Sequence, residues 1–168
     1  MLFSKKRTAF TLLAAVCITA AIIVATPGPR AGSAFSGPEV SFIAPVYGTI
    51  TFGYGEPKKY NVHAISISAD EGTPVYAAAD GVVIRAGYDS GDGKHIAVSH
   101  ANGYESVYNH LQDILVTEGQ QVRRGQPIGT VGSTGKSVGP HLSFELLRGG
   151  EFIDPESVIR FDMPRRGS

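Results

Sequence analysis

The sequence predicts an all-β fold, an antiparallel sheet or sandwich, preceded by one N-terminal membrane helix. From about Ser41 onward the chain consists of short β-prone runs separated by Gly, Pro, Asn and Asp, a spacing typical of antiparallel sheets. No sustained helical period occurs after residue 35. The N-terminal part of the chain contains one uncharged apolar run, from about Ala9 to Thr26. These observations divide the 168 residues into an apolar N-terminal segment and a single β domain.

The N-terminal segment has the pattern of an exported protein. Lys5, Lys6 and Arg7 precede the apolar run, and this order keeps the N-terminus inside while the remainder crosses the membrane. The run is longer than that of a usual signal peptide and just shorter than the ~20 residues that span a bilayer. We therefore expect an uncleaved signal anchor and a Pro/Gly linker over residues 1–34; a signal peptide cleaved after Ala34 is the alternative.

The part beyond this segment is mildly acidic. It contains eleven basic and fifteen acidic residues, a net charge of −4. Such a domain has no electrostatic footprint for nucleic acid. The only cysteine, Cys17, lies in the apolar run, so the exported part has no internal disulfide. These features agree with a bacterial envelope protein outside the cytoplasmic membrane, either anchored or secreted.

The predicted strands lie in a domain that we place at residues 35–162. Turn-forming residues bound each strand, and the glycines among them tolerate the positive φ that tight hairpins require. In chain order the strands are Thr49–Phe52 between two glycines, Val62–Ser68 ahead of Asp70 and Gly72, Gly81–Ala86 after Asp80, His95–Ser99 after a Gly/Asp-rich turn, Glu105–His110 after Asn102-Gly103, Pro127–Val131 between Gly125 and Gly132, and His141–Leu147 after Pro140. We expect a disordered tail over residues 163–168.

A series of short motifs runs through residues 44–155 in a fixed order. They are Pro45-Val46-Tyr47-Gly48, Gly72-Thr73-Pro74-Val75-Tyr76-Ala77, Asp80-Gly81-Val82-Val83, Asn102-Gly103-Tyr104, Tyr108-Asn109-His110-Leu111, Gly125-Gln126-Pro127-Ile128-Gly129, Gly132-Ser133-Thr134-Gly135 and Pro140-His141-Leu142. In order and spacing the chain resembles the LytM/lysostaphin-type zinc metallopeptidases, which cut peptide cross-links in bacterial peptidoglycan. The resemblance implies the LytM-type β fold, which is similar to a duplicated hybrid motif.

The resemblance also implies where the family's zinc site would lie. In the family, a His and an Asp four residues apart and the second His of a His-x-His hold the zinc. The matching positions in this chain are Val62, Ser66 and Ser143. Valine has no donor atom and a serine hydroxyl is a weak zinc ligand, so we expect the zinc cofactor to be lost and the chain not to be an enzyme. His63 is a substitute donor, but strand side chains alternate between faces, so it points away from where position 62 points.

Two histidines of the family pattern remain, His110 and His141. In the family, the matching positions lie beside the metal and stabilise the polarised water and the developing oxyanion. Without zinc we expect them to be relicts that line a binding groove with Tyr108, Asn109 and Ser143. The groove would contact peptidoglycan stem peptides or a protein partner. A purely structural hydrogen bond is the alternative role for each histidine.

The function implied by the resemblance is therefore binding. Similar degenerate LytM-type domains switch on peptidoglycan amidases at the division septum or act as scaffolds between membrane complexes, including during sporulation. The alternative is an active endopeptidase whose altered metal site uses His63, His110 and His141. Other chemistries find less support. A Ser–His–Asp triad lacks a nucleophile elbow, and the turn at residues 132–137 lacks phosphate-loop spacing. A lipoyl or biotinyl carrier needs a lysine at a hairpin tip between acidic or apolar neighbours, whereas Lys94 and Lys136 lie in Gly/Ser-rich turns.

Overall fold

The computed structural model describes residues 39–56 and 63–167. The predicted signal anchor and linker over residues 1–34 lie outside the described residues, as does Val62. Within the described ranges, no helix has the length and apolar character needed to cross a membrane.

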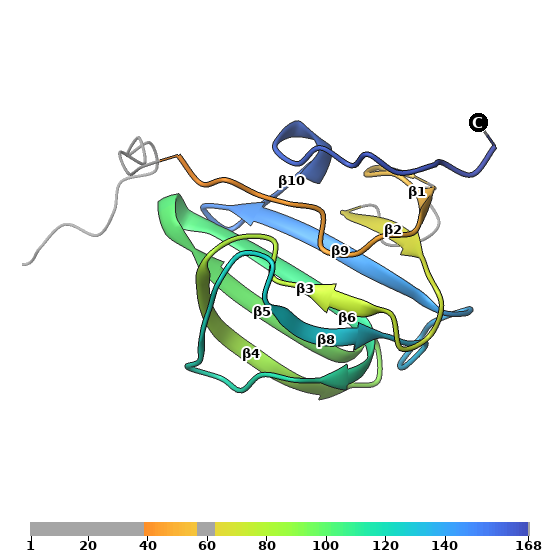
Figure 1. Cartoon of the computed structure of the whole chain (residues 1–168), viewed down its shortest axis with the longest axis horizontal. Coiled ribbons are helices and arrows are strands. Elements are labelled where there is room, and N and C mark those ends of the chain that lie inside the picture. The colour runs from red at the N-terminus through yellow and green to blue at the C-terminus, as the bar shows by residue number, and fades with distance from the viewer. Residues whose placement is uncertain (1–38, 57–62, 168) are drawn as a thin grey trace, which may run out of the picture. The chain divides into compact units, whose positions relative to one another are not determined.

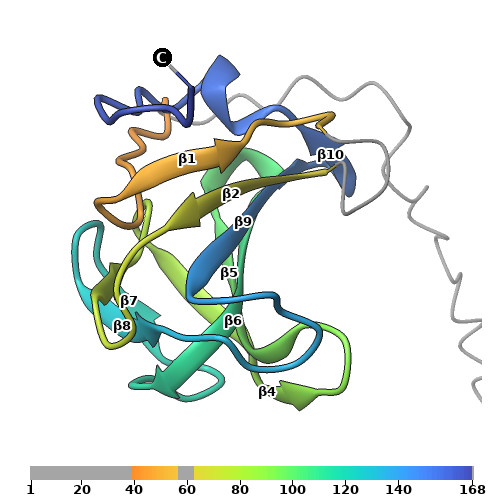
Figure 2. The ribbon, with the colours of Figure 1, turned by 90° about the vertical axis from the view of Figure 1, so that its right-hand side faces the viewer.

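The described chain forms one antiparallel β-sheet, which confirms the all-β fold class (Figures 1 and 2). The main path of the sheet has the order β1-β2-β9-β6-β5-β4-β7, while β10 pairs with β9 and β8 pairs with both β3 and β6. The strands are β1 (Thr49–Phe52), β2 (Ala64–Ser68), β3 (Pro74–Tyr76), β4 (Gly81–Asp89), β5 (Gly93–His100), β6 (Tyr104–Ile114), β7 (Gln121–Val122), β8 (Pro127–Val131), β9 (His141–Arg148) and β10 (Glu151–Ile153).

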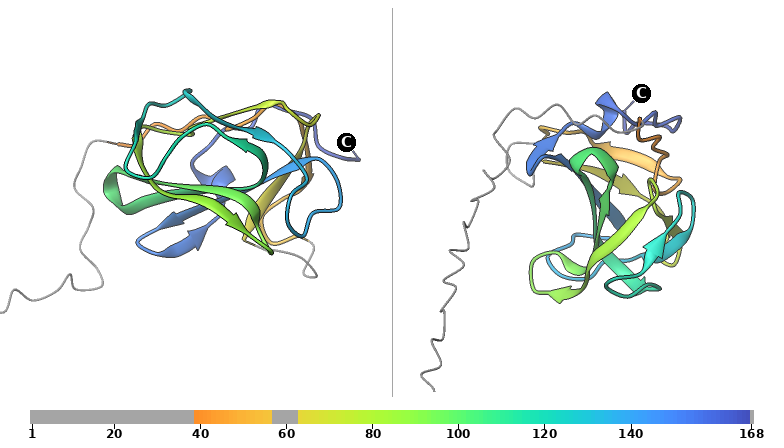
Figure 3. Two further views of the ribbon diagram at one scale, coloured as in Figure 1. Left: turned by 90° about the horizontal axis from the view of Figure 1, so that it is seen from below. Right: turned by 90° about the vertical axis from the view of Figure 1, so that its left-hand side faces the viewer.

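The core lies on one face of the central strands. Strand residues alternate between faces, and in β9 the residues Leu142, Phe144 and Leu146 are fully buried. The neighbouring strand β2 contributes Ile65 and Ile67 to the same cluster. Figure 3 shows the segments of β3 and β8 folded over β4, β5 and β6. Buried residues of both layers, such as Val75, Val98 and Ile128, belong to one core cluster. The opposite face of β2 and β9 does not pack against this core, and it carries the candidate functional site described below.

The C-terminal tail differs from the predicted disorder over its described part, residues 163–167. The Ile50 N–H donates to the Pro164 carbonyl at 2.9 Å, and the Arg166 N–H donates to the Ile50 carbonyl at 2.9 Å. Met163 packs against the core. The tail thus lies beside β1 as a short parallel bridge (Figures 1 and 2). The packing of Met163 and the hydrogen bonds to the edge of β1 therefore order the tail, although its composition alone does not indicate this.

Candidate functional site

A groove of about 570 Å³ lies over the face of β2 and β9 that is opposite to the core. Its floor includes Ser66 and Ser143, which lie on the face of β2 and β9 opposite the core residues Ile65, Ile67, Leu142 and Phe144. One wall comes from β1 and the C-terminal tail, and the other comes from the β4–β5 turn and the loop before β9. The lining residues are Thr51, Phe52, Glu56, Ala64, Ser66, Ser68, Gly91, Asp92, His110, Lys136, Val138, Gly139, Pro140, His141, Ser143 and Arg166.

Ser66 and Ser143 lie directly opposite each other in the floor. They are Cα partners in the β2–β9 ladder, so their side chains emerge side by side on one face. The Thr51 hydroxyl donates to the Ser66 carbonyl at 3.1 Å and approaches the Ser66 hydroxyl at 3.2 Å. The structure therefore brings together two of the three positions where the resemblance implied zinc ligands, and both carry neutral hydroxyls.

His110 and His141 stand together on the groove wall, with ring centroids 4.8 Å apart. His110 Nδ1 lies 2.9 Å from the Thr134 carbonyl, and His141 Nδ1 lies 2.8 Å from the Gly139 carbonyl. A carbonyl only accepts hydrogen bonds, so Nδ1 carries the proton in both rings. A ring that holds its proton on Nδ1 alone keeps Nε2 as an acceptor. Burial of the ring, and next the neighbouring His141, lower the pKa of His110, which favours this neutral state.

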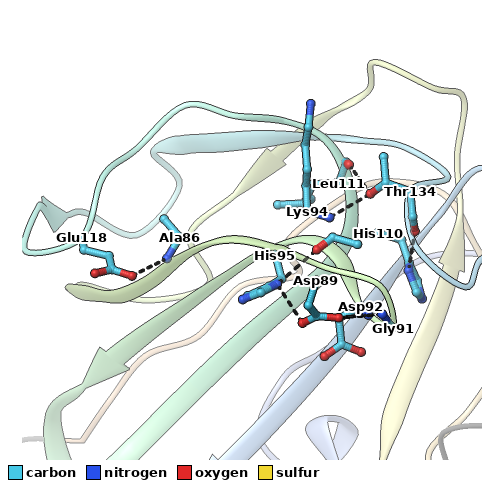
Figure 4. Close-up of polar contacts among 11 residues, drawn as sticks. Ala86, Asp89, Gly91, Asp92, Lys94, His95, His110, Leu111, Glu118 and Thr134 are labelled. Carbon is cyan, nitrogen blue, oxygen red and sulfur yellow. Dashed lines mark hydrogen bonds and ion pairs between the residues drawn. The ribbon is translucent and has the colours of Figure 1, made fainter.

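The β4–β5 turn and the loop before β9 hold this wall in place (Figure 4). The Asp89 carboxylate accepts the backbone N–H groups of Gly91 at 2.7 Å and Asp92 at 2.8 Å, and these bonds hold its pKa below the usual value. The Lys94 N–H donates to the Thr134 hydroxyl at 2.9 Å, and that hydroxyl donates to the Leu111 carbonyl at 2.7 Å. The same loop therefore fixes the carbonyl that orients His110.

Tyr108 does not line the groove, so its predicted place there is wrong. It lies on the core face of β6 and is fully buried. Its hydroxyl accepts the Ala78 N–H at 2.9 Å and is 2.9 Å from the Ser106 hydroxyl, which in turn is 2.7 Å from His100 Nε2. Burial raises the pKa of Tyr108 to about 12. The motif containing Tyr108 therefore serves the core.

Asn109 shares a face with the groove floor but lies beneath its surface. It is the Cα partner of Ser143, yet only 2% of it is exposed and it does not line the groove. The prediction that Asn109 lines the binding groove is therefore wrong as well. Within the described ranges its amide oxygen is the one buried side-chain polar atom that lacks a hydrogen-bond partner.

Replacing Tyr108 with phenylalanine will lower the free energy of unfolding by about 1–3 kcal/mol, because the buried Ala78 N–H loses its acceptor. Urea unfolding measures this loss. The imidazole NMR signals of His110 and His141 will stay where they are, since the hydroxyl lies on the other side of the sheet. Displaced histidine signals with unchanged stability would contradict this assignment of Tyr108 to the core.

His63 lies away from the groove. Its ring stacks on Phe152 at a centroid distance of 4.6 Å and an interplanar angle of 14°. It is exposed and does not contribute to the groove lining. Over residues 39–56 and 63–167, no group of three or more His, Cys, Asp and Glu residues is arranged to hold a metal ion. The donors that face each other in the floor are hydroxyls, which do not fit the ligand set of a tight zinc site.

The comparisons with known proteins agree with this fold. The sequence pattern of peptidase family M23 matches residues 60–155, more than half of the chain. The chain belongs to this family. The M23 domain is 44% identical over 90 residues to the peptidoglycan DD-endopeptidase ShyC of Vibrio cholerae, a match that covers 54% of this chain and 21% of that protein.

Two further relatives of the M23 domain bear on its role. It is 42% identical over 114 residues to the murein hydrolase activator EnvC of Escherichia coli, which is 67% of this chain and 27% of that protein. A zinc containing peptidase from Vibrio cholerae superposes with a TM-score of 0.65 at 34% identity, covering 74% of this chain and 41% of that one. The chain thus spans about a fifth to a quarter of the length of these curated relatives. The family relates it to peptidoglycan and the cell envelope.

Proposed function

We propose that this M23 domain is non-catalytic and acts in the cell envelope by binding, anchored through residues 1–34 or secreted. In this role its groove holds a peptidoglycan stem peptide, and the domain regulates a peptidoglycan hydrolase or scaffolds a membrane complex. The observation that carries the proposal is the pair of serines in the groove floor. Ser66 and Ser143 occupy directly opposed positions of β2 and β9, and together they offer no imidazole, thiolate or carboxylate to a metal.

The loss of zinc follows from the chemistry of these donors. Structural and catalytic zinc sites use thiolates, imidazoles and carboxylates, and three protein ligands are the usual minimum. Hydroxyls bring neither negative charge nor comparable donor strength. Without a bound zinc, no water in the groove is brought to a pKa near neutrality. His110 and His141 then act as hydrogen-bond acceptors for a ligand.

The groove suits a short peptide. Its volume of about 570 Å³ lies inside the range of about 300–1,000 Å³ that is common for small-ligand sites. The Nε2 atoms of His110 and His141 can accept from the N–H groups of an extended chain. Val138 on the rim is 93% exposed and offers an apolar contact. The relation to a murein hydrolase activator supports a regulatory role for the bound state.

The alternative function is an active peptidoglycan endopeptidase with a rearranged metal site, and the similarity to ShyC favours it. Such a site would recruit His63, His110 and His141. The stacking of His63 on Phe152 weighs against this arrangement, because the ring would have to leave an aromatic partner and turn toward the groove. We therefore rank binding above hydrolysis.

The zinc content of the protein tests the proposal. Purified without a metal-binding tag, dialysed against zinc and then desalted, it will retain well below one zinc per chain, because the floor serines are weak donors. The zinc containing peptidase from Vibrio cholerae serves as the positive control. One tightly held zinc per chain would overturn the proposal and direct attention to the three histidines.

A release assay with dye-labelled peptidoglycan tests the regulatory part. The protein alone will release no dye, whereas a peptidoglycan amidase will release more dye in its presence than in its absence. Release by the protein alone would support the endopeptidase. An amidase rate that does not respond would leave the scaffold as the remaining form of the proposal.

A further inference from the structure

The C-terminal tail contributes a side chain to the groove. Backbone hydrogen bonds on both sides of Ile50 fix the tail beside β1, at the edge of the sheet nearest the floor strand β2. Arg165 forms an ion pair with Glu156, and the adjacent residue, Arg166, lines the groove. The tail is therefore bridged to the edge strand β1, and it presents Arg166 on the groove wall that includes Thr51 and Phe52.

Arg166 differs from the other arginines near the end of the chain. Arg160 pairs with Asp162 at 2.7 Å, and Arg165 pairs with Glu156. Arg166, by contrast, forms no ion pair with an acid in the described part of the chain, and it is exposed. An unengaged guanidinium on the wall of a groove offers a planar fork of donors to an incoming anion.

We propose that Arg166 is a specificity-determining residue that binds the C-terminal carboxylate of the peptide held in the groove. This inference rests on the proposed function, since it takes a peptidoglycan stem peptide as the occupant. A guanidinium binds a carboxylate through two parallel hydrogen bonds, which adds geometric selectivity to the charge. Lysine offers only a point charge, so the arginine itself matters for the preference.

The position of Arg166 suits a chain end better than a chain interior. It stands exposed beside β1, the edge strand of the sheet. An extended peptide that lies over Ser66 and Ser143, with its N–H groups toward His110 and His141, has its far end at a wall of the groove. Lys136 lies on the opposing wall, where its backbone N–H donates to the Gly91 carbonyl at 2.8 Å. It offers no fork of donors to compete for the same carboxylate.

Calorimetric titration of the full chain with two synthetic stem tetrapeptides tests this inference. One peptide ends in a free carboxylate and the other in an amide. The wild-type protein will bind the free acid about tenfold or more tightly than the amide, as expected for a charged hydrogen-bond pair. Arg166→Ala will bring the affinity for the acid down to that for the amide and leave the amide affinity unchanged. Arg166→Lys will retain only part of the preference.

The control is Arg160→Ala, which removes an arginine that does not line the groove and will change neither affinity. Urea unfolding of each variant excludes loss of the fold as the cause. If Arg166→Ala retains the full preference for the free acid, the inference is wrong while the proposed function stands. The same holds if the wild type binds both peptides equally. If the wild type binds neither peptide, peptide binding and the inference fail together.

Discussion

Replacing Gly135 with alanine will lower the free energy of unfolding by about 2–5 kcal/mol. Gly135 has a φ of +69°, and an added Cβ would lie 2.6 Å from the Gly91 carbonyl oxygen and 2.7 Å from the Gly93 Cα. The left-handed backbone costs a residue with a Cβ about 1–2 kcal/mol, and forced overpacking adds about 1–3 kcal/mol. The neighbouring atoms belong to the backbone, so no side chain can move aside to relieve the contact.

Gly119→Ala is the matched control. Gly119 has a φ of +81°, but an added Cβ would have no atom within 4 Å. It will therefore show the backbone cost without the contact, about 1–2 kcal/mol. Urea unfolding of the two variants separates the two contributions. Equal losses in the free energy of unfolding would mean that the β4–β5 turn and the loop before β9 can move apart without an energetic cost. That result would contradict the close packing of these two segments.

The effect of Gly135→Ala will reach the groove as well. Thr134 precedes Gly135 and supplies the carbonyl that accepts from His110 Nδ1, and the His110 N–H donates to the Asp92 carbonyl in the facing turn at 2.8 Å. Separation of the turn from the loop therefore moves both anchors of this histidine. We expect a displaced His110 imidazole signal in NMR spectra of this variant and an unchanged one in the Gly119 control.

The fold was predictable where strands are long and alternate clearly. The last long strand was expected at residues 141–147 and is observed at His141–Arg148, because polar and apolar residues alternate over residues 141–146 of the sequence. β7, at Gln121–Val122, and β3, at Pro74–Tyr76, were not predicted as strands. Segments this short carry no period, and only their pairing with distant strands makes them regular.

The site was predictable in part. His110, His141 and Ser143, which the family motifs single out, line the groove. The prediction that Tyr108 lines the groove is wrong because it placed Tyr108, Asn109 and His110 together. Adjacent strand residues face opposite sides of the sheet. Arg166 was missed altogether. It joins the groove only because the tail pairs with β1, and that pairing leaves no trace in local composition.

Restoring the three ligand types together will create a tight zinc site. The triple variant Val62→His, Ser66→Asp, Ser143→His will bind zinc at least about a thousandfold more tightly than the wild type, because structural zinc sites contribute on the order of 10 kcal/mol or more. Directly opposed strand residues have Cβ atoms about 4.5–5.5 Å apart, and zinc–ligand bonds are about 2 Å long. An aspartate at 66 and a histidine at 143 can therefore share one ion. Competition with a chromophoric chelator measures the affinity.

Ser143→His alone is the control, and it tests whether one added imidazole in the groove floor is enough to bind zinc. A single imidazole paired with the Ser66 hydroxyl on β2 and the Asn109 amide on β6 gives fewer than the three strong ligands that a zinc site requires, so we expect this variant to retain little zinc and to cleave no peptidoglycan cross-links. Cleavage by the single variant would mean that residues elsewhere, with His63 foremost, already complete a metal site. A triple variant that gains no affinity would instead mean that the β2–β9 floor has moved away from the family's ligand geometry, and the loss of hydrolysis would then lie in the backbone as well as in the side chains.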